Sequence, residues 1–259
     1  MNDLDLILQA ATEAGELALS ARESGLKIWS KDGGSPVTDA DLAVDTLLKT
    51  ELMAERPDYG WLSEETADDP ARLSTRRQFV VDPIDGTVAF MKGKPWFAVS
   101  IAVVENGQPI AGVVHAPALD ETFVATLDGP VTLNGAPIAP SATGELLDCA
   151  MLGDAKMFGH PAWREPWPAM RVESRNSIAY RMCLVASGAF DAAIALSPKS
   201  EWDLAAAELI CRRAGAWVSD HKGRDFAYNR PVPTVPSLVC ANKALAPLIL
   251  SRVGHIELP

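Results

Sequence analysis

The sequence has few cysteines and no closely spaced pair of them. Its 259 residues include only Cys149, Cys183, Cys211 and Cys240, and each has apolar or small neighbours. Without a C-x-x-C pair, the pattern excludes a zinc site built on paired cysteines and a dense disulfide framework. We therefore expect four reduced cysteines in the hydrophobic core.

A block rich in lysine and arginine is also missing. The chain carries 23 basic and 34 acidic residues, for a formal net charge of −11 at pH 7, which argues against a nucleic acid polymer as a partner. Acidic residues interrupt the apolar residues of positions 1–20, so this segment predicts neither a signal peptide nor a membrane span. We expect a soluble, cytoplasmic protein that binds no membrane. A Walker loop and a kinase signature are absent too.

Apolar residues at steps of three and four predict two helices near the start of the chain. The first runs from about residue 4 and closes near Gly25. Thr38 or Asp39 caps the second, which ends before Pro57. The residues expected on its inner face are Leu42, Val44, Leu47, Leu48 and Leu52.

Alternating patterns and turn residues predict an antiparallel meander in the middle of the chain. The strongest hairpin signal joins 98–104 to 110–114, and further strands are expected at 122–127 and 131–133. A stretch with proline and glycine at 140–144 suggests two domains, 1–142 and 143–259. In the second domain we expect strands at 149–152, 192–196 and 237–241 and helices at 178–187, 201–214 and 245–253.

The stretch Val80-Val81-Asp82-Pro83-Ile84-Asp85-Gly86-Thr87 carries the clearest chemical signal. It predicts a buried strand that delivers two carboxylates, which repel each other unless a cation lies between them. Carboxylate and carbonyl oxygens select Mg²⁺, Mn²⁺ or Ca²⁺ rather than Zn²⁺. Gly86 and Thr87 at a helix start would suit an anion such as phosphate. An Asp-Pro turn followed by an ordinary helix cap explains the same residues equally well.

Other acids lie where they could join such a site. The strand 60–65 ends in Glu64 and Glu65, and one of them can reach the ion of Asp82 if this strand runs beside 78–81. Asp41 and Asp203 each fall in the first turn of a predicted helix, where an acid also complements the helix dipole. The alternative is that none of these acids binds a metal. Glu64 and Glu65 would then lie on the surface, and Asp41 and Asp203 would only complement a helix dipole.

Several stretches together resemble the signatures of the inositol monophosphatase superfamily. They are Trp61-Leu62-Ser63-Glu64-Glu65, Asp82-Pro83-Ile84-Asp85-Gly86-Thr87 and Trp202-Asp203-Leu204-Ala205-Ala206, with the lead-in Ser35-Pro36-Val37-Thr38-Asp39-Ala40-Asp41. Their order and spacing match over nearly the whole chain. The resemblance implies an α/β (α+β) layered sandwich, with a largely antiparallel sheet between helices in the N-terminal half and a smaller mixed sheet in the C-terminal half. It further implies Mg²⁺-dependent, lithium-sensitive hydrolysis of a small phosphomonoester.

The resemblance also implies roles for individual residues. The first metal would be held by Glu64, Asp82 and the carbonyl of Ile84, and the second by Asp82, Asp85 and Asp203. Roughly two or three Mg²⁺ ions are implied, with Mn²⁺ as a substitute. Glu64 and Thr87 would position and deprotonate the attacking water, with Asp41 supporting Thr87. The N–H groups of Gly86 and Thr87 would hold phosphate oxygens.

The substrate is less well determined than the chemistry. Val88-Ala89 replaces a polar pair common after Gly-Thr in this family, and no acid precedes Glu201 where inositol-specific members carry one. Ser200-Glu201-Trp202-Asp203 is closer to the 3'(2'),5'-bisphosphate nucleotidase branch, in which Lys199 and Glu201 would contact the substrate. Both inositol monophosphate and a bisphosphate nucleotide therefore stay open. Family members are often dimeric, so a homodimer is one implied assembly. A non-catalytic cation-binding or interaction module on the same fold is the competing function.

Overall fold

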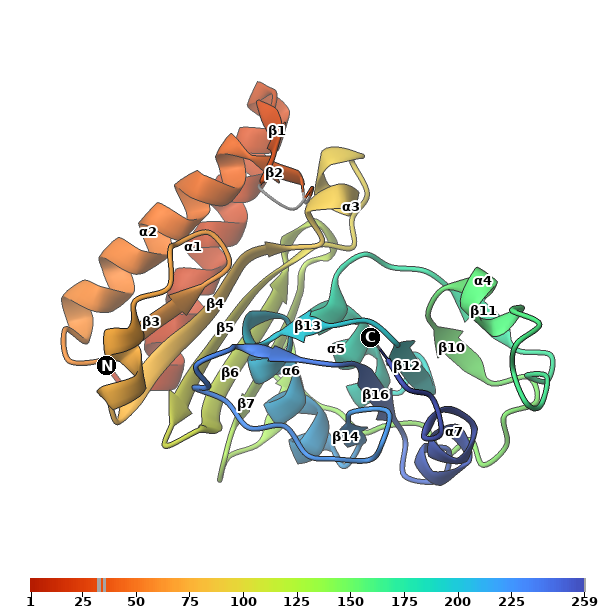
Figure 1. Ribbon diagram of the computed structural model, residues 1–259. Helices are drawn as coiled ribbons and strands as arrows, with labels where there is room; N and C mark the ends of the chain where they lie inside the picture. Colours follow the sequence, from red (N-terminus) through yellow and green to blue (C-terminus); the bar gives the residue numbers. More distant parts are fainter. Residues whose placement is uncertain (32–33, 35, 259) are drawn as a thin grey trace.

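The computed structural model of the protein describes residues 1–31, 34 and 36–258. Positions 32, 33, 35 and 259 lie outside the described residues. Ser35 is the first residue of the lead-in stretch in the family resemblance. Figure 1 shows a layered arrangement in which a large twisted sheet is flanked by helices and a second sheet lies beyond them. The layered α/β architecture is the predicted fold class.

The large sheet has seven strands in the order β3-β4-β5-β6-β7-β8-β9. β3 and β4 pair in parallel and the remaining neighbours are antiparallel, which confirms the meander and places the two acid-bearing strands side by side. The strands are β3 (Gly60–Ser63), β4 (Arg77–Asp85), β5 (Ala98–Glu105), β6 (Gln108–Ala116), β7 (Glu121–Thr126), β8 (Val131–Leu133) and β9 (Ala136–Pro137). A two-stranded sheet of β1 (Ile28–Ser30) and β2 (Pro36–Thr38) precedes them.

Two N-terminal helices, α1 (Asp3–Ser24) and α2 (Asp39–Glu55), cover one face of this sheet. Gly25 ends α1 and Thr38 caps α2, as the sequence predicts. Val44, Leu48 and Leu52 are buried, but Leu42 is 42% exposed, so its expected place on the inner face is wrong. Leu42 precedes Val44 by two residues, and two steps of 100° turn its side chain to the opposite side of the helix.

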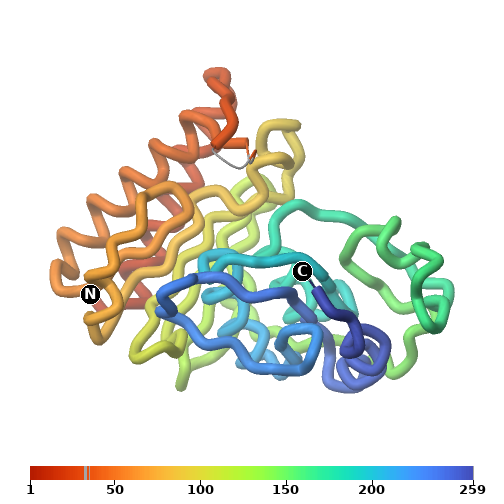
Figure 2. Tube along the Cα trace, viewed as in Figure 1, coloured from red at the N-terminus to blue at the C-terminus, as the bar shows by residue number. Residues whose placement is uncertain are grey.

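The other face of the large sheet is covered by helices from the C-terminal half. These are α5 (Ile178–Ala186) and α6 (Glu201–Ala214), which Figure 2 shows between the large sheet and the C-terminal strands. One core cluster contains both Val80 of β4 and Ala205 of α6. The two halves thus share apolar surface, and the division into domains 1–142 and 143–259 stays a prediction.

The second sheet is mixed and has the order β11-β10-β12-β16-β14. β10 pairs in parallel with β11 and β12, while β16 runs antiparallel to β12 and β14. The elements of this layer are β10 (Ala150–Leu152), α4 (Ala155–Phe158), β11 (Arg171–Glu173), β12 (Ala192–Ala195), β14 (Trp217–Ser219), β16 (Leu238–Ala241) and α7 (Ala246–Val253).

The four cysteines are buried and free, as expected. Cys211 Sγ and Cys240 Sγ lie 3.6 Å apart without a disulfide. Among the described residues, no helix combines the length and the apolar character needed to cross a membrane.

Small residues let α6 approach the large sheet closely. An added Cβ at Gly112 of β6 would lie 3.0 Å from both the Cα and the carbonyl oxygen of Ala206 in α6. These are backbone atoms, which cannot rotate aside as a side chain can. The spacing between α6 and the sheet therefore depends on the absence of a side chain at Gly112.

We predict that Gly112→Ala destabilises the protein by about 1–3 kcal/mol, because the methyl group overpacks the contact between α6 and β6. Urea unfolding followed by circular dichroism measures the change. Gly144→Ala is the matched control, since a Cβ at Gly144 meets no atom within 4 Å. Equal stability losses in the two variants would contradict the prediction.

Candidate functional site

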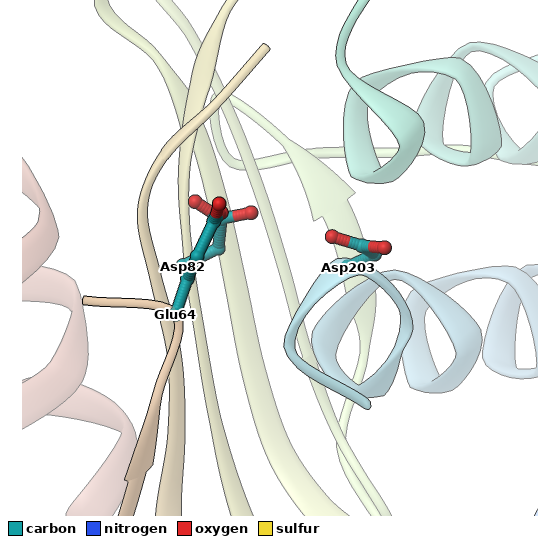
Figure 3. Close-up of side chains that lie close together, drawn as sticks. All are labelled: Glu64, Asp82 and Asp203. Carbon is teal, nitrogen blue, oxygen red and sulfur yellow. The ribbon is translucent and has the colours of Figure 1, made fainter. Parts of the chain in front are cut away.

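Three acidic side chains from distant segments meet at one end of the large sheet. Glu64 follows β3, Asp82 lies in β4 and Asp203 lies in the first turn of α6. One carboxylate oxygen of each lies within 4.8 Å of the others, so the group could hold a metal ion. Figure 3 shows the Asp82 carboxylate facing Asp203 across the space between the strands and α6.

The parallel pairing of β3 and β4 brings the first two acids together. Ser63 is in register with Val81, and the Glu64 N–H donates to the Val81 carbonyl at 3.3 Å. The pairing of β4 with β5 then shifts register between Asp82 and Asp85, around Pro83. Such an irregularity redirects the following side chains, and it separates the two carboxylates of the motif.

Asp203 reaches the cluster from a helix cap. The Ser200 N–H donates to Asp203 Oδ2 at 2.9 Å in a capping box at the start of α6. Ser100 Oγ of β5 donates to the Trp202 carbonyl at 3.3 Å and ties this end of the helix to the sheet. Asp203 therefore has both of the roles that the sequence left open. It caps the N-terminus of α6 and also faces the other acids.

Burial makes the cluster electrostatically unfavourable in the absence of a cation. Asp82 is 1% exposed and its Oδ1 accepts from the Ile84 N–H at 3.1 Å, whereas its Oδ2 is buried without any partner among the described residues. Burial, followed by the charges of Glu64 and Asp85, raises the pKa of Asp82 well above its usual value. Burial and then Asp85 raise the pKa of Asp203 to about 8. A divalent cation supplies the partner that these oxygens lack.

Asp85 lies beside the cluster but is held by another element. Its carboxylate accepts hydrogen bonds from Ser177 Oγ at 2.5 Å and from the N–H groups of Ile178 at 3.1 Å and Ala179 at 2.7 Å. These donors form the N-terminus of α5. Burial, as the largest cause, raises the pKa of Asp85 to about 6. Asp85 is thus outside the group of three acids, although it lines the same hollow.

Thr87 and Asp41 are in contact, as expected. Thr87 Oγ1 lies 3.2 Å from Asp41 Oδ1 and 3.2 Å from the Ile84 carbonyl, so its single proton can be donated to either. Asp41 is 1% exposed and accepts from the Thr38 N–H at 2.8 Å and from the Thr38 hydroxyl at 2.5 Å in a capping box of α2. Its pKa is raised chiefly by burial. Asp41 therefore caps its helix and also orients Thr87.

Gly86 forms the sharp turn between β4 and α3 (Thr87–Met91). Its φ of 94° lies in the left-handed region, and an added Cβ would lie 2.9 Å from the Ser177 nitrogen. The N-termini of α3 and α5 therefore approach each other at this glycine. They border a hollow of about 190 Å³ whose lining residues are Pro36, Glu64, Asp82, Asp85, Gly86, Thr87, Val88, Asn176 and Asp203.

Glu65 and Lys31 form the outer part of the site. Lys31 Nζ lies 2.9 Å from Glu64 Oε1 and 2.7 Å from Glu65 Oε1. Burial is the largest cause that raises the pKa of Glu65, to about 7. Both glutamates thus pair with Lys31, but of the two only Glu64 belongs to the group of three acids. Sequence reasoning missed this pair, as it missed Asn176 in the hollow, because neither has a distinctive local pattern.

Glu201 is a correction to the expected substrate contacts. Its carboxylate is buried and accepts from the N–H groups of Asn229 at 2.8 Å and Arg230 at 3.1 Å. It does not line the hollow. Two residues on a helix turn by about 200°, so the orientation that brings Asp203 to the site directs Glu201 to the 229–230 loop. The side chain therefore bonds to a loop and lies outside the hollow.

The motifs belong to a sequence family that covers almost the whole chain. The sequence profile described as the inositol monophosphatase family matches residues 3–257. The chain belongs to the inositol monophosphatase family. It is a phosphatase by this family membership, and its acid cluster could bind a metal ion.

Individual members of the family carry different substrate names. The chain is 31% identical to a histidinol-phosphatase of Chlorobaculum parvum, over 98% of each chain. It is 30% identical to the 3'(2'),5'-bisphosphate nucleotidase CysQ of Escherichia coli, over 87% of this chain and 93% of the other. The solved structure of an IMPase from Thermotoga maritima is 27% identical, covers 98% of this chain and 97% of its own, and has a TM-score of 0.85.

We predict that the metal-free protein loses stability as the pH rises toward 8. The folded-state pKa of Asp203, about 8, exceeds its ordinary value of 3.8, so between these values the folded state binds more protons than the unfolded state. Asp82→Asn removes one charge from the cluster and should flatten this dependence. Melting temperatures in EDTA between pH 6 and 8.5 measure both slopes. Added Mg²⁺ should raise the melting temperature of the wild type more than that of Asp82→Asn, and parallel curves would contradict the prediction.

A second prediction concerns Glu201. Glu201→Gln should lower the free energy of unfolding by about 1–3 kcal/mol, because the N–H groups of Asn229 and Arg230 lose a charged acceptor. The KM of the folded fraction should stay at the wild-type value. Urea unfolding and steady-state kinetics together test this, and a raised KM at unchanged stability would restore Glu201 as a substrate contact.

Proposed function

We propose that the protein is a Mg²⁺-dependent phosphomonoesterase that hydrolyses a small phosphorylated metabolite. The Oδ2 of Asp82 carries this proposal, because it is buried without a partner in the described part of the chain. It lies in a cluster with Glu64 and Asp203 and beside the Gly86–Thr87 turn. An acid cluster calls for a cation, and a helix N-terminus next to it favours an anion. A phosphate monoester bound together with Mg²⁺ meets both requirements.

In this proposal the first Mg²⁺ is held by Glu64, Asp82 and the Ile84 carbonyl, and the second by Asp82, Asp85 and Asp203. Roughly two or three ions fit such a set of oxygen ligands, and Mn²⁺ can replace Mg²⁺. When bound, the ions supply positive charge to the phosphate and lower the pKa of water. For Asp85 we propose a secondary role in metal binding, because three hydrogen bonds from the N-terminus of α5 already orient its carboxylate.

The protein's own groups place the phosphate and the attacking water. N–H groups in the first turn of a helix have no intrahelical partner, and those of Gly86 and Thr87 would donate to phosphate oxygens. The Thr87 hydroxyl would accept the proton of the water on the side facing Glu64, while its own proton is directed to Asp41. Asp41 is held by Thr38 and so keeps this hydroxyl in one orientation.

The proposed substrates are an inositol monophosphate or a 3'(2'),5'-bisphosphate nucleotide, and the name of the Chlorobaculum relative adds histidinol phosphate. Val88 gives the hollow an apolar wall beside the phosphate-binding turn. Lithium sensitivity and a homodimer follow from the resemblance, and a cytoplasmic location is expected from the acidic residues that interrupt positions 1–20. All three belong to this proposal.

The test is release of inorganic phosphate from a panel of phosphomonoesters with and without Mg²⁺. We expect activity that requires the metal, and at least about a hundredfold lower kcat for Asp82→Asn and Thr87→Ala. Thr87→Ser keeps the hydroxyl and should retain most of the activity. Lys243→Gln, on the exposed surface, is the control.

A non-catalytic cation-binding module on the same fold gives a different result. It would bind Mg²⁺, seen as a rise in melting temperature, and would release no phosphate from any substrate of the panel. Wild-type turnover by Asp82→Asn in saturating Mg²⁺ would also overturn the proposal.

A further inference from the structure

A buried arginine packs on the strand that leads to the acid cluster. Arg72 lies in η1 (Pro70–Ser74), the short 3₁₀ helix between β3 and β4, and is 2% exposed. η1 sits directly against β3, since a Cβ added to Gly60 would lie 2.9 Å from the Cβ of Arg72. Gly60 is the first residue of β3, and Glu64 directly follows its last. Arg72 is therefore fixed to the strand that positions Glu64.

The guanidinium of Arg72 joins η1 to a loop of the C-terminal half. Its Nη1 donates to Asn229 Oδ1 at 2.9 Å, and its Nη2 donates to the Arg230 carbonyl at 2.9 Å. Nε and Nη2 also donate to the Asp68 carboxylate, at 2.5 and 2.8 Å. In Figure 2 the blue segment that contains the loop extends toward the orange segment of the N-terminal half. The planar fork of an arginine reaches these three acceptors at once, which the compact ammonium of a lysine cannot do.

The same loop holds the start of α6. Glu201, the first residue of α6, is 1% exposed and accepts from the N–H groups of Asn229 at 2.8 Å and Arg230 at 3.1 Å. Asn229 has a φ of 58°, in the left-handed region, so these bonds hold a turn that few residues adopt. Asp203 follows Glu201 by two residues in the first turn of the helix. Hydrogen bonds thus run from Arg72 through the loop to the turn that carries Asp203.

This connection opposes the repulsion within the acid cluster. The cluster is assembled from two elements, the large sheet and α6, and without a cation the like charges push these elements apart. The bond from Ser100 to the Trp202 carbonyl also ties α6 to the sheet, but both of its partners are neutral. Each bond from Arg72 or Glu201 to the loop has one charged partner and is therefore stronger.

From these contacts, and resting on the proposed function, we infer that Arg72 is a positioning residue for the metal site. Arg72 is not one of the described residues that line the hollow, so it acts on a bound cation only through the loop and Glu201. By fixing α6 against β3 it keeps Asp203 close enough to Asp82 for one divalent ion to contact both carboxylates. Without the guanidinium this distance can widen, and part of the free energy of Mg²⁺ binding is then used to close it. Mg²⁺ affinity should fall, and saturating Mg²⁺ should restore the geometry.

Calorimetric titration with Mg²⁺ tests the role of Arg72 without relying on turnover. Arg72→Met keeps an apolar stem and removes the fork. We expect its Kd for Mg²⁺ to rise by about tenfold, as for other groups that orient metal ligands. The Mg²⁺ concentration for half-maximal phosphate release should rise by the same factor, while kcat in saturating Mg²⁺ changes by less than about twofold. Circular dichroism at the temperature of the titration verifies that each variant is folded.

Two control variants separate positioning from stability. Asp68→Asn breaks the ion pair of Arg72 but leaves its bonds to the loop in place. Arg56→Met removes an arginine that likewise bonds a carboxylate, Asp3 Oδ1 at 2.9 Å, and a backbone carbonyl, that of Met1 at 2.8 Å, at the C-terminal end of α2. Both variants should leave the Kd for Mg²⁺ within about twofold of the wild-type value, because neither touches the connection to α6.

A double variant tests the route through the loop. Glu201→Gln weakens the other side of the same connection, so it should also raise the Kd for Mg²⁺, while its KM for substrate in saturating Mg²⁺ stays at the wild-type value. Adding Arg72→Met to Glu201→Gln should raise the Kd by less than about twofold more, because both act on one connection. Arg72→Lys keeps the charge without the fork, and its Kd should lie between those of the wild type and Arg72→Met. It replaces Arg72→Met if that variant fails to fold.

Three results would overturn the inference. They are a Kd for Mg²⁺ within about twofold of the wild-type value in the Arg72 variants, an equal loss of affinity in Asp68→Asn or Arg56→Met, and fully additive effects in the double variant. Each of these leaves phosphate release by the wild type intact. Failure of the proposed function is distinct, because the wild type would then bind Mg²⁺ and release no phosphate from any substrate of the panel.

Discussion

Mutual repulsion among Glu64, Asp82 and Asp203 is the constraint on which the site depends. Their oxygens lie within 4.8 Å of one another, and burial, followed by the neighbouring acidic charges, raises the pKa of Asp82 and of Asp203. The fold holds each carboxylate through one oxygen, by Lys31, by the Ile84 N–H and by the Ser200 N–H. The acids are therefore positioned before any cation binds, and the free energy of their repulsion is available to favour cation binding.

α6 links this constraint to the packing of the molecule. Its first turn carries Asp203, and its small residues lie against the large sheet where Gly112 leaves room for them. The capping box and the bond from Ser100 to the Trp202 carbonyl fix the same end of the helix. A shift of α6 along the sheet would move Asp203 away from Asp82, so the core shared by the two halves also sets the geometry of the site.

The local parts of this structure could be predicted from the sequence. Strand, turn and helix follow from the pattern around Asp82-Pro83-Ile84-Asp85-Gly86-Thr87, and the Thr38 cap follows from residue types alone. The convergence of Asp203 with Asp82 came from the family resemblance, because nothing local joins residues 121 positions apart. Tertiary contacts decided what was missed. The hydrogen bond of Ser177 to Asp85 and the loop bonds of Glu201 require knowledge of which elements meet. The exposure of Leu42, in contrast, follows from the roughly 100° step between helix residues once Val44 lies on the inner face.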